Sequence, residues 1–236
     1  MQPFINENKV KINAQIGRWT SIAGLGVLIV GMVVSITKPE LVMVSLGCLV
    51  LGFLGSTIGA YYANHWTKSP RADEALTGAL KGLSNQYHLY HYLLPVPHVL
   101  VGPTGFFILR AYLHDGQITY DGKKWKQKFS WLRALGFSGQ DALANPLQDA
   151  GYDVQRLYTW LKKRVPQDAI PPITPLIVFV RDGVELDVAE TEVPVLNHKQ
   201  LKRWMRNAIK RLPQLLGPDE LYDLERAMFG DKIDEL

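Results

Sequence analysis

WTSIAGLGVLIVGMVVSI at residues 19–36 and LVMVSLGCLVLGFLGSTIGAYY at residues 41–62 are two apolar stretches without a formal charge. About 20 apolar residues in a helix cross a bilayer core of roughly 30 Å. Backbone amides inside lipid must form hydrogen bonds within their own segment, which favours a helix for each stretch. Pro39, in the short connection between them, suits the first turn of a following helix. The sequence therefore predicts a transmembrane helical hairpin over residues 17–63, after an N-terminal segment of residues 1–16.

Two other interpretations of these stretches are weaker. A cleaved signal peptide has a shorter apolar core and is not followed directly by a second span. A helical hairpin in a soluble core has a polar face, whereas the polar residues here are small hydroxyls. Basic residues flank the outer ends of both spans: Lys9, Lys11 and Arg18 before the first, and Lys68, Arg71 and Lys81 after the second. By the positive-inside rule, we expect a multi-pass protein of the cell (inner) membrane with both termini in the cytoplasm.

Small residues recur at intervals of seven in both apolar stretches. Gly24 and Gly31 follow this spacing in the first, and Gly52 and Gly59 in the second, where Gly55 and Gly59 also form a GxxxG motif. Small side chains let helix backbones approach closely in lipid. We therefore predict helix packing through these five glycines, either within the hairpin or against a partner helix.

The chain beyond the hairpin, about 170 residues, is long enough for one domain with its own core. Helical patterns occur at residues 72–83, 145–164, 199–212 and 219–229, and strand-like segments at 87–94, 98–101, 106–112, 118–120 and 176–180. The order of these elements predicts a mixed α/β domain with a central sheet over residues 64–197. C-terminal helices and an acidic tail follow at residues 198–236. The net charge of the chain is a modest +4.

Residues 93–112 (LLPVPHVLVGPTGFFILRAY) resemble the core of the nuclease-related domain, NERD, a relative of the restriction-endonuclease fold. The likeness extends upstream to Asp73 and Glu74, and downstream through Trp125 and the Asn145-Pro146-Leu147 motif to the buried strand that ends at Phe179. It spans roughly residues 70–197. The resemblance implies a restriction-endonuclease-like mixed α/β domain.

The resemblance also implies a catalytic pattern: an acid on the first helix, an Asp directly before the His of the second strand, and Glu-x-Lys at the end of the third. Such carboxylates would hold Mg²⁺, and the lysine would stabilise charge on the scissile phosphate. Glu74 and His98 occupy the helix acid and the histidine, but Pro97, Arg110 and Tyr112 replace the Asp, Glu and Lys. A proline side chain cannot ligate a metal, and a guanidinium repels a divalent cation. We expect a scaffold without catalytic residues, bound metal or cofactor.

Other groups of reactive residues are few. Asp115 and Asp121 lie on predicted turns near the third strand and could replace the lost ligands, although Asp-Gly is also an ordinary turn pair. His88 and His91 are three residues apart on a predicted strand, so they face opposite sides and make a poor metal pair. The single cysteine, Cys48, excludes an intramolecular disulfide. The sequence contains no phosphate-binding glycine loop, GxSxG, HExxH or Cys/His finger motif.

Two basic tracts are candidates for binding an anionic surface. The first interleaves lysines with aromatic residues, and the second is a predicted amphipathic helix over residues 199–212. Their basic residues are Lys123, Lys124, Lys126 and Lys128 in the first tract, and Lys199, Lys202, Arg203, Arg206, Lys210 and Arg211 in the second. Anionic lipid headgroups, nucleic acid, and a solvated face that merely covers the core are the three interpretations that the sequence leaves open.

The sequence thus favours a two-pass membrane protein whose cytoplasmic NERD-like domain has lost catalysis and acts in binding or scaffolding at the lipid bilayer. One alternative is an accessory subunit that docks on a larger membrane complex, or on a second copy of the chain, through the glycines of the hairpin. Another is a membrane-anchored nuclease with relocated metal ligands. A mutational or metal-binding test distinguishes the inactive domain from the nuclease, and co-purification under mild detergent identifies an accessory subunit.

Overall fold

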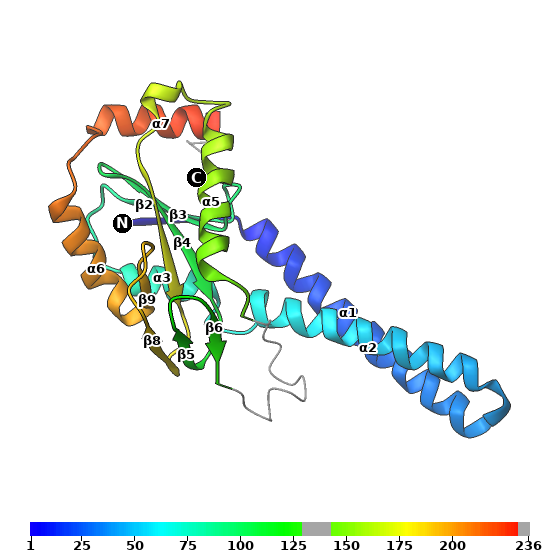
Figure 1. The fold of residues 1–236 in the computed structure, drawn as a ribbon. Coiled ribbons are helices and arrows are strands. Elements are labelled where there is room, and N and C mark those ends of the chain that lie inside the picture. The colour runs from blue at the N-terminus through cyan, green and yellow to red at the C-terminus, as the bar shows by residue number, and fades with distance from the viewer. Residues whose placement is uncertain (129–142, 231–236) are drawn as a thin grey trace. The chain divides into compact units, whose positions relative to one another are not determined.

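The computed structural model describes residues 1–128 and 143–230 of the chain (Figure 1). These residues form two compact units. One is a helical hairpin of residues 7–71. The other is an α/β domain to which residues 1–6, 72–128 and 143–230 contribute.

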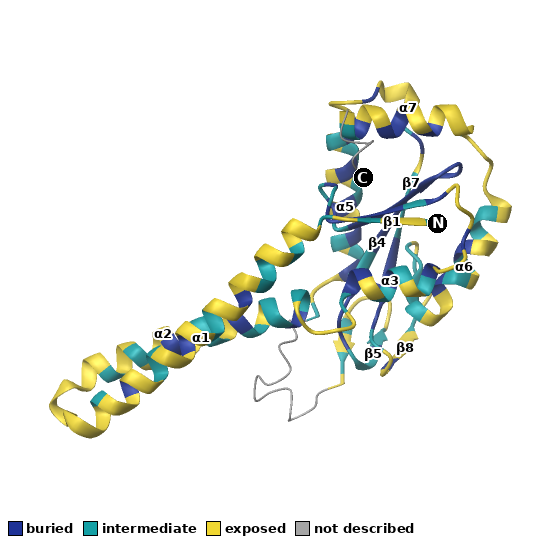
Figure 2. Ribbon diagram, turned by 180° about the vertical axis from the view of Figure 1, so that it is seen from behind, coloured by how far each residue is buried: buried dark blue, intermediate teal, exposed yellow. Residues whose placement is uncertain are grey.

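The hairpin consists of α1 (Glu7–Thr37), a single 3₁₀ turn (Pro39–Leu41) and α2 (Val42–Trp66). Both helices are long and apolar enough to cross a membrane, and only 11% and 6% of the residues in their most apolar windows are buried. The buried positions of α1 are all glycines, and most of both helices is exposed (Figure 2). The exposed positions include many large aliphatic residues. A helix in the core of a soluble protein would bury its large apolar side chains instead. The hairpin therefore has the surface expected of helices in lipid.

The central sheet of the α/β domain has six strands in the order β1-β2-β3-β4-β7-β9. Their bounds are β1 (Gln2–Ile5), β2 (His88–His91), β3 (His98–Gly102), β4 (Gly105–Tyr112), β7 (Ile173–Phe179) and β9 (Val195–Asn197). The pairs β2/β3 and β3/β4 are antiparallel, and β1/β2, β4/β7 and β7/β9 are parallel. A second sheet joins β6 (Trp125–Gln127), β5 (Gly116–Tyr120) and β8 (Val184–Val188).

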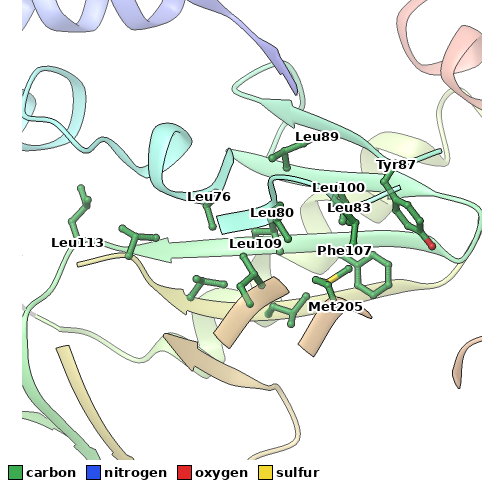
Figure 3. Packing of buried hydrophobic residues seen from close by; sticks show 14 residues of the cluster. Leu76, Leu80, Leu83, Tyr87, Leu89, Leu100, Phe107, Leu109, Leu113 and Met205 are labelled. Atoms are coloured by element: carbon green, nitrogen blue, oxygen red, sulfur yellow. The ribbon is translucent and has the colours of Figure 1, made fainter. Parts of the chain in front are cut away.

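Helices cover both faces of the central sheet. On one face, α3 (Ala72–Leu80) and α6 (His198–Arg211) supply Leu76, Leu80 and Met205 to a cluster with Phe107 and Leu109 of β4 (Figure 3). On the other face, buried side chains of α5 (Pro146–Leu161) and α7 (Pro218–Phe229) pack with the alternate residues of β3 and β4. Strand β7 is buried on both faces, which confirms the expectation for residues 176–180. The mixed α/β fold with a central sheet is thus confirmed.

The turn between β3 and β4 requires glycine. Gly105 has a φ of +108°, and a Cβ there would lie 2.6 Å from the carbonyl oxygen of Pro172. The backbone enters the left-handed region and also approaches a neighbouring strand, so that no side chain fits. This turn belongs to the segment that carries the family resemblance, and it fixes the register of the two strands that hold the candidate site.

Several elements differ from the sequence-based expectations. Residues 2–5, predicted to be part of a separate N-terminal segment, form the edge strand β1 of the central sheet. Strands β6, β8 and β9 were not predicted, because each is short and half-buried. The C-terminal helices, predicted as a separate region, contribute fully buried core residues such as Leu201 and Met205. The acidic tail from residue 231 lies outside the described residues.

Candidate functional site

Strand β4 directs two of the replaced catalytic positions toward α5. Phe107 and Leu109 belong to the cluster under α3 and α6, so the alternate residues Arg110 and Tyr112 face the opposite side of the sheet. Asn145 caps the N-terminus of α5, where its side chain accepts a hydrogen bond from the backbone N–H of Gln148. That cap sets the start of the helix that faces Arg110 and Tyr112.

Arg110 and Tyr112 are bound to two carboxylates of α5. The guanidinium of Arg110 donates from Nη1 to Asp153 Oδ2 at 3.0 Å and from Nη2 to Asp149 Oδ2 at 3.4 Å. The hydroxyl of Tyr112 donates to Asp149 Oδ2 at 2.7 Å. Asp149 and Asp153 are four residues apart and therefore lie on one face of the helix. The positions that the resemblance assigns to a metal ligand and a lysine thus form an ion-pair network between strand and helix.

Burial and charge act against each other in this network. The side chain of Asp153 is only 2% exposed, and its burial raises the pKa of the carboxyl despite the opposing charge of Arg110. Burial is the largest single influence on Arg110 and disfavours its charge, but Asp153, Tyr112 and Asp149 together outweigh it and raise the pKa of the guanidinium. Burial also raises the pKa of the Tyr112 phenol, which donates to Asp149. Tyr112 is therefore a neutral hydrogen-bond donor.

His98, the position that matches the histidine of the family, lies in a separate buried cluster on the α3 side of the sheet. Its Nδ1 is 2.8 Å from Nδ1 of His91, whose Nε2 is 2.9 Å from the hydroxyl of Thr77. Burial, together with the neighbouring His91 and Arg110, holds the pKa of His98 well below its usual range. With His98 neutral, one of the two Nδ1 atoms in this short contact donates a hydrogen and the other accepts it.

Two neighbouring acidic residues lie at the start of α3, and only one of them is buried. Glu74, assigned to this position from the sequence, is exposed, whereas Asp73 is completely buried. The hydroxyl of Tyr92 donates to Asp73 Oδ1 at 3.3 Å. Tyr92 has a φ of +62°, a conformation that is costly for an aromatic residue and that the surrounding contacts must hold. Pro97 follows in the same hairpin, where its carbonyl oxygen accepts the backbone N–H of Tyr92 at 2.7 Å.

The residues at the family's metal-binding positions do not fit Mg²⁺. A proline and an arginine stand where carboxylates are needed, and the guanidinium already occupies the oxygens of Asp149 and Asp153. Among the described residues, no group of three or more His, Cys, Asp or Glu side chains could hold a metal ion. The alternative ligand Asp121 caps a turn: its Oδ1 accepts the backbone N–H groups of Lys123 and Lys124, which lower the pKa of the carboxyl to about 2. Asp115 starts the same hairpin, and its carbonyl oxygen accepts from Gln127.

The two basic tracts lie on different elements. In the first, Lys123, Lys124 and Lys128 are exposed near β6, while Lys126 pairs with Asp121 at 3.2 Å. In the second, α6 buries its apolar side in the core. Its basic residues Lys202, Arg203, Arg206 and Lys210 remain at least partly exposed and form no ion pair within the described residues.

The glycines of the hairpin lie between α1 and α2. A Cβ at Gly24 would come within 2.6 Å of the backbone nitrogen of Ser56, and one at Gly55 within 3.1 Å of Gly24 Cα. Three further glycines make equally close approaches across the pair, at positions 31, 52 and 59. By contrast, Gly26 and Gly47 have no such neighbour within 4 Å. The periodic glycines serve the packing of the hairpin itself, which is one of the two possibilities that the sequence left open.

Sequence reasoning missed the partners that define the network and the histidine pair. Asp149 and Asp153 were not singled out, although their i,i+4 spacing on an amphipathic helix was a usable signal. His91 was weighed only against His88, and its contact with His98 follows from the register in which His91 of β2 pairs directly with His98 of β3. Tyr92 has no sequence signal, because a positive φ outside glycine is set by tertiary contacts.

A known protein-family model matches the part of the chain that holds this site. Residues 70–180 match the family model of the nuclease-related domain, NERD. No curated protein and no solved structure matches the chain. The matched region contains α3, the hairpin of β3 and β4, α5 and β7, which are the elements that hold the site described above. Residues 70–180 of this chain are therefore a nuclease-related domain of the NERD family.

Proposed function

We propose that this chain is a two-pass membrane protein whose nuclease-related domain has lost phosphodiester cleavage and acts in binding or scaffolding at the membrane surface. The observation that carries the proposal is the ion pair of Arg110 with Asp153 and Asp149. A fixed guanidinium takes the place where the family resemblance puts a carboxylate for a divalent cation. Its charge would repel such a cation and its donors already satisfy the neighbouring carboxylates.

The alternative of a nuclease with relocated ligands has less support. Asp121 is engaged in turn capping and an ion pair with Lys126, the ordinary role of an aspartate before glycine. The exposed Glu74 has no second carboxylate at the family's other ligand positions, because Pro97 and Arg110 occupy them. Asp121, one of the two aspartates that would have to replace the family's ligands, thus already has an ordinary structural role.

The accessory-subunit alternative also loses its main argument. It relied on outward-facing glycines, but the periodic glycines pack within the hairpin. A partner helix would instead have to bind the aliphatic outer surface, which any transmembrane helix presents to lipid.

We further propose that the domain faces the cytoplasm and that α6 contacts anionic lipid headgroups. The basic residues that flank both spans support this orientation under the positive-inside rule. The exposed basic side chains of α6 that form no ion pair within the described residues, such as Arg203 and Lys210, support the contact, since each basic residue near an anionic surface contributes about 1 kcal/mol. A cysteine substituted for Lys38, between the spans, should react with an impermeant maleimide in intact cells. Reaction at a cysteine replacing Asp121 instead would reverse the orientation.

A nuclease assay tests the loss of catalysis. It requires the full chain in detergent micelles, because strand β1 precedes the hairpin and a truncation at residue 64 removes it from the sheet. We expect no cleavage of single- or double-stranded DNA or RNA with Mg²⁺ or Mn²⁺. Cleavage that disappears in both Glu74→Ala and Asp115→Ala variants, but persists in the exposed control Asp223→Ala, would refute the proposal and support the enzyme interpretation.

A further inference from the structure

A cavity next to α7 contains a buried acid and a histidine that the candidate site does not use. Its volume is about 330 Å³, within the range of roughly 300–1,000 Å³ that is usual for small-molecule sites. His88 of β2 and Glu225 of α7 line it, together with apolar side chains that include Leu216 and Leu221 and the phenol of Tyr222. Glu225 lies beyond residues 70–180, so the cavity depends on a helix that is not part of the family match.

Glu225 is buried, and one of its two carboxylate oxygens is fixed by hydrogen bonds. It is only 3% exposed, and its Oε1 accepts hydrogen bonds from the hydroxyl of Tyr90 at 2.7 Å and from Nδ1 of His88 at 2.6 Å. An ionised carboxylate can only accept, so Nδ1 of His88 carries its hydrogen. Phe4 and Tyr90 stack at 5.2 Å, and Phe4 also contacts the edge of the His88 ring at 5.6 Å. The three groups are therefore fixed before any ligand binds.

The remaining polar atoms of this pair are acceptors. Within the described residues, Oε2 of Glu225 and Nε2 of His88 have no hydrogen-bond partner, and neither is among the fully buried unsatisfied atoms. With Nδ1 protonated, a neutral His88 presents a lone pair at Nε2. No basic side chain other than His88 lines the cavity. Beside its apolar walls and the amides of Gln86 and Gln214, the cavity thus offers two acceptors: the carboxylate of Glu225 and, when His88 is neutral, Nε2 of that ring.

We propose that this cavity binds a small organic cation with at least two N–H donors, such as an amidine, a guanidine or a primary amine. The cation would donate to Oε2 of Glu225, and a second N–H would reach Nε2 of His88. Charge-assisted hydrogen bonds of this kind are about twice as strong as neutral ones, and a planar fork of donors matches a carboxylate. The phenol of Tyr222 and the side chains of Leu216 and Leu221 would contact the apolar body of the ligand.

Three probes of the same shape test the charge requirement: benzamidine is a cation, benzamide is neutral and benzoate is an anion. Each is titrated into the full chain in detergent micelles, with binding followed by saturation-transfer NMR. We expect saturable binding of benzamidine, at least about tenfold weaker binding of benzamide, and none of benzoate. Equal affinity for benzamidine and benzamide, or no saturable benzamidine binding, would overturn the proposal.

A matched pair of variants locates the binding. Glu225→Gln removes the charge while its amide oxygen still accepts from Tyr90, and Asp223→Asn removes an equal charge from an exposed position of the same helix. We expect Glu225→Gln to weaken benzamidine binding about tenfold or more and Asp223→Asn to leave it unchanged. Equal effects of the two would show a diffuse attraction and overturn the assignment. If Glu225→Gln does not fold, His88→Gln provides the second measurement. Unchanged benzamidine affinity in that folded variant would likewise refute the site.

Discussion

Replacing Arg110 with methionine should destabilise the domain by leaving a buried carboxylate without its partner. The Asp153 side chain is 2% exposed and loses its 3.0 Å hydrogen bond from Arg110. Removal of one partner of a buried ion pair costs about 3–5 kcal/mol. Part of this cost is offset here, because Arg156 lies 4.0 Å from Asp153 Oδ1 and because burial already favours protonation of Asp153. We therefore expect a loss of about 2–3 kcal/mol in the free energy of unfolding.

A double-mutant cycle separates the pair from its surroundings. Asp153→Leu should also destabilise the domain, whereas the variant with both substitutions should recover part of the loss, since an apolar pair can replace a buried ion pair. The full chain in micelles is unfolded thermally and followed by tryptophan fluorescence. For a domain of this size, 1 kcal/mol corresponds to about 2–4 °C in Tm, so Arg110→Met should lower Tm by about 5–10 °C.

The substitution Arg110→Glu makes the test sharper. It places a third carboxylate beside Asp149 and Asp153, so it should destabilise more than Arg110→Met in the absence of divalent cations. Mg²⁺ should then stabilise Arg110→Glu and have no comparable effect on the wild type. The reasoning would be refuted if Arg110→Met changed the free energy of unfolding by less than about 0.5 kcal/mol, the usual range for surface substitutions. It would also be refuted if the two single substitutions were additive.

Three further predictions concern the hairpin, the histidine pair and α6. Gly24→Leu should lower the thermal stability of the hairpin in detergent, because its Cβ alone would lie 2.6 Å from the backbone nitrogen of Ser56. Gly26→Leu should leave the stability unchanged. Equal effects of the two substitutions would show that the glycine spacing is incidental. The depressed pKa of His98 means that the unfolded chain binds the proton more tightly, so stability should be full above about pH 6.5 and fall by about 1.4 kcal/mol per pH unit below it. His98→Asn should flatten this acid limb of the stability curve, and an unchanged slope would contradict the buried neutral state. In nanodiscs, amide exchange of α6 should be slower with anionic than with zwitterionic lipid. Reversal of Lys202, Arg203 and Arg206 to Glu should remove the difference, whereas reversal of Lys162, Lys163 and Arg164, in the turn after α5, should not.

The parts of the fold that could be predicted are those with strong local patterns. The spans, α5, α6 and the β3–β4 turn follow from apolar runs, helical periodicity and glycine chemistry. Strand β1 could not be predicted, because four residues next to a long helix have no periodicity of their own and acquire a structure by pairing with β2, 86 residues later. Glu74 was assigned to the acid position of the first helix, but α3 is oriented so that Asp73 is buried instead.

In the candidate site, too, single positions could be assessed from the sequence, but their distant partners could not. The loss of the family's ligands was visible at Pro97, Arg110 and Tyr112, since each position can be compared by itself. What replaced them was not visible, because Asp149 and Asp153 lie 37–43 residues from their partners on β4. Two carboxylates of α5 now surround a permanent cation on the strand, where the family resemblance places ligands for a metal ion. A guanidinium does not dissociate, and its charge does not vary with pH in the physiological range. The contacts between Arg110 and the two carboxylates therefore do not depend on the concentration of divalent cation, whereas a metal site built from carboxylates at this strand–helix junction would.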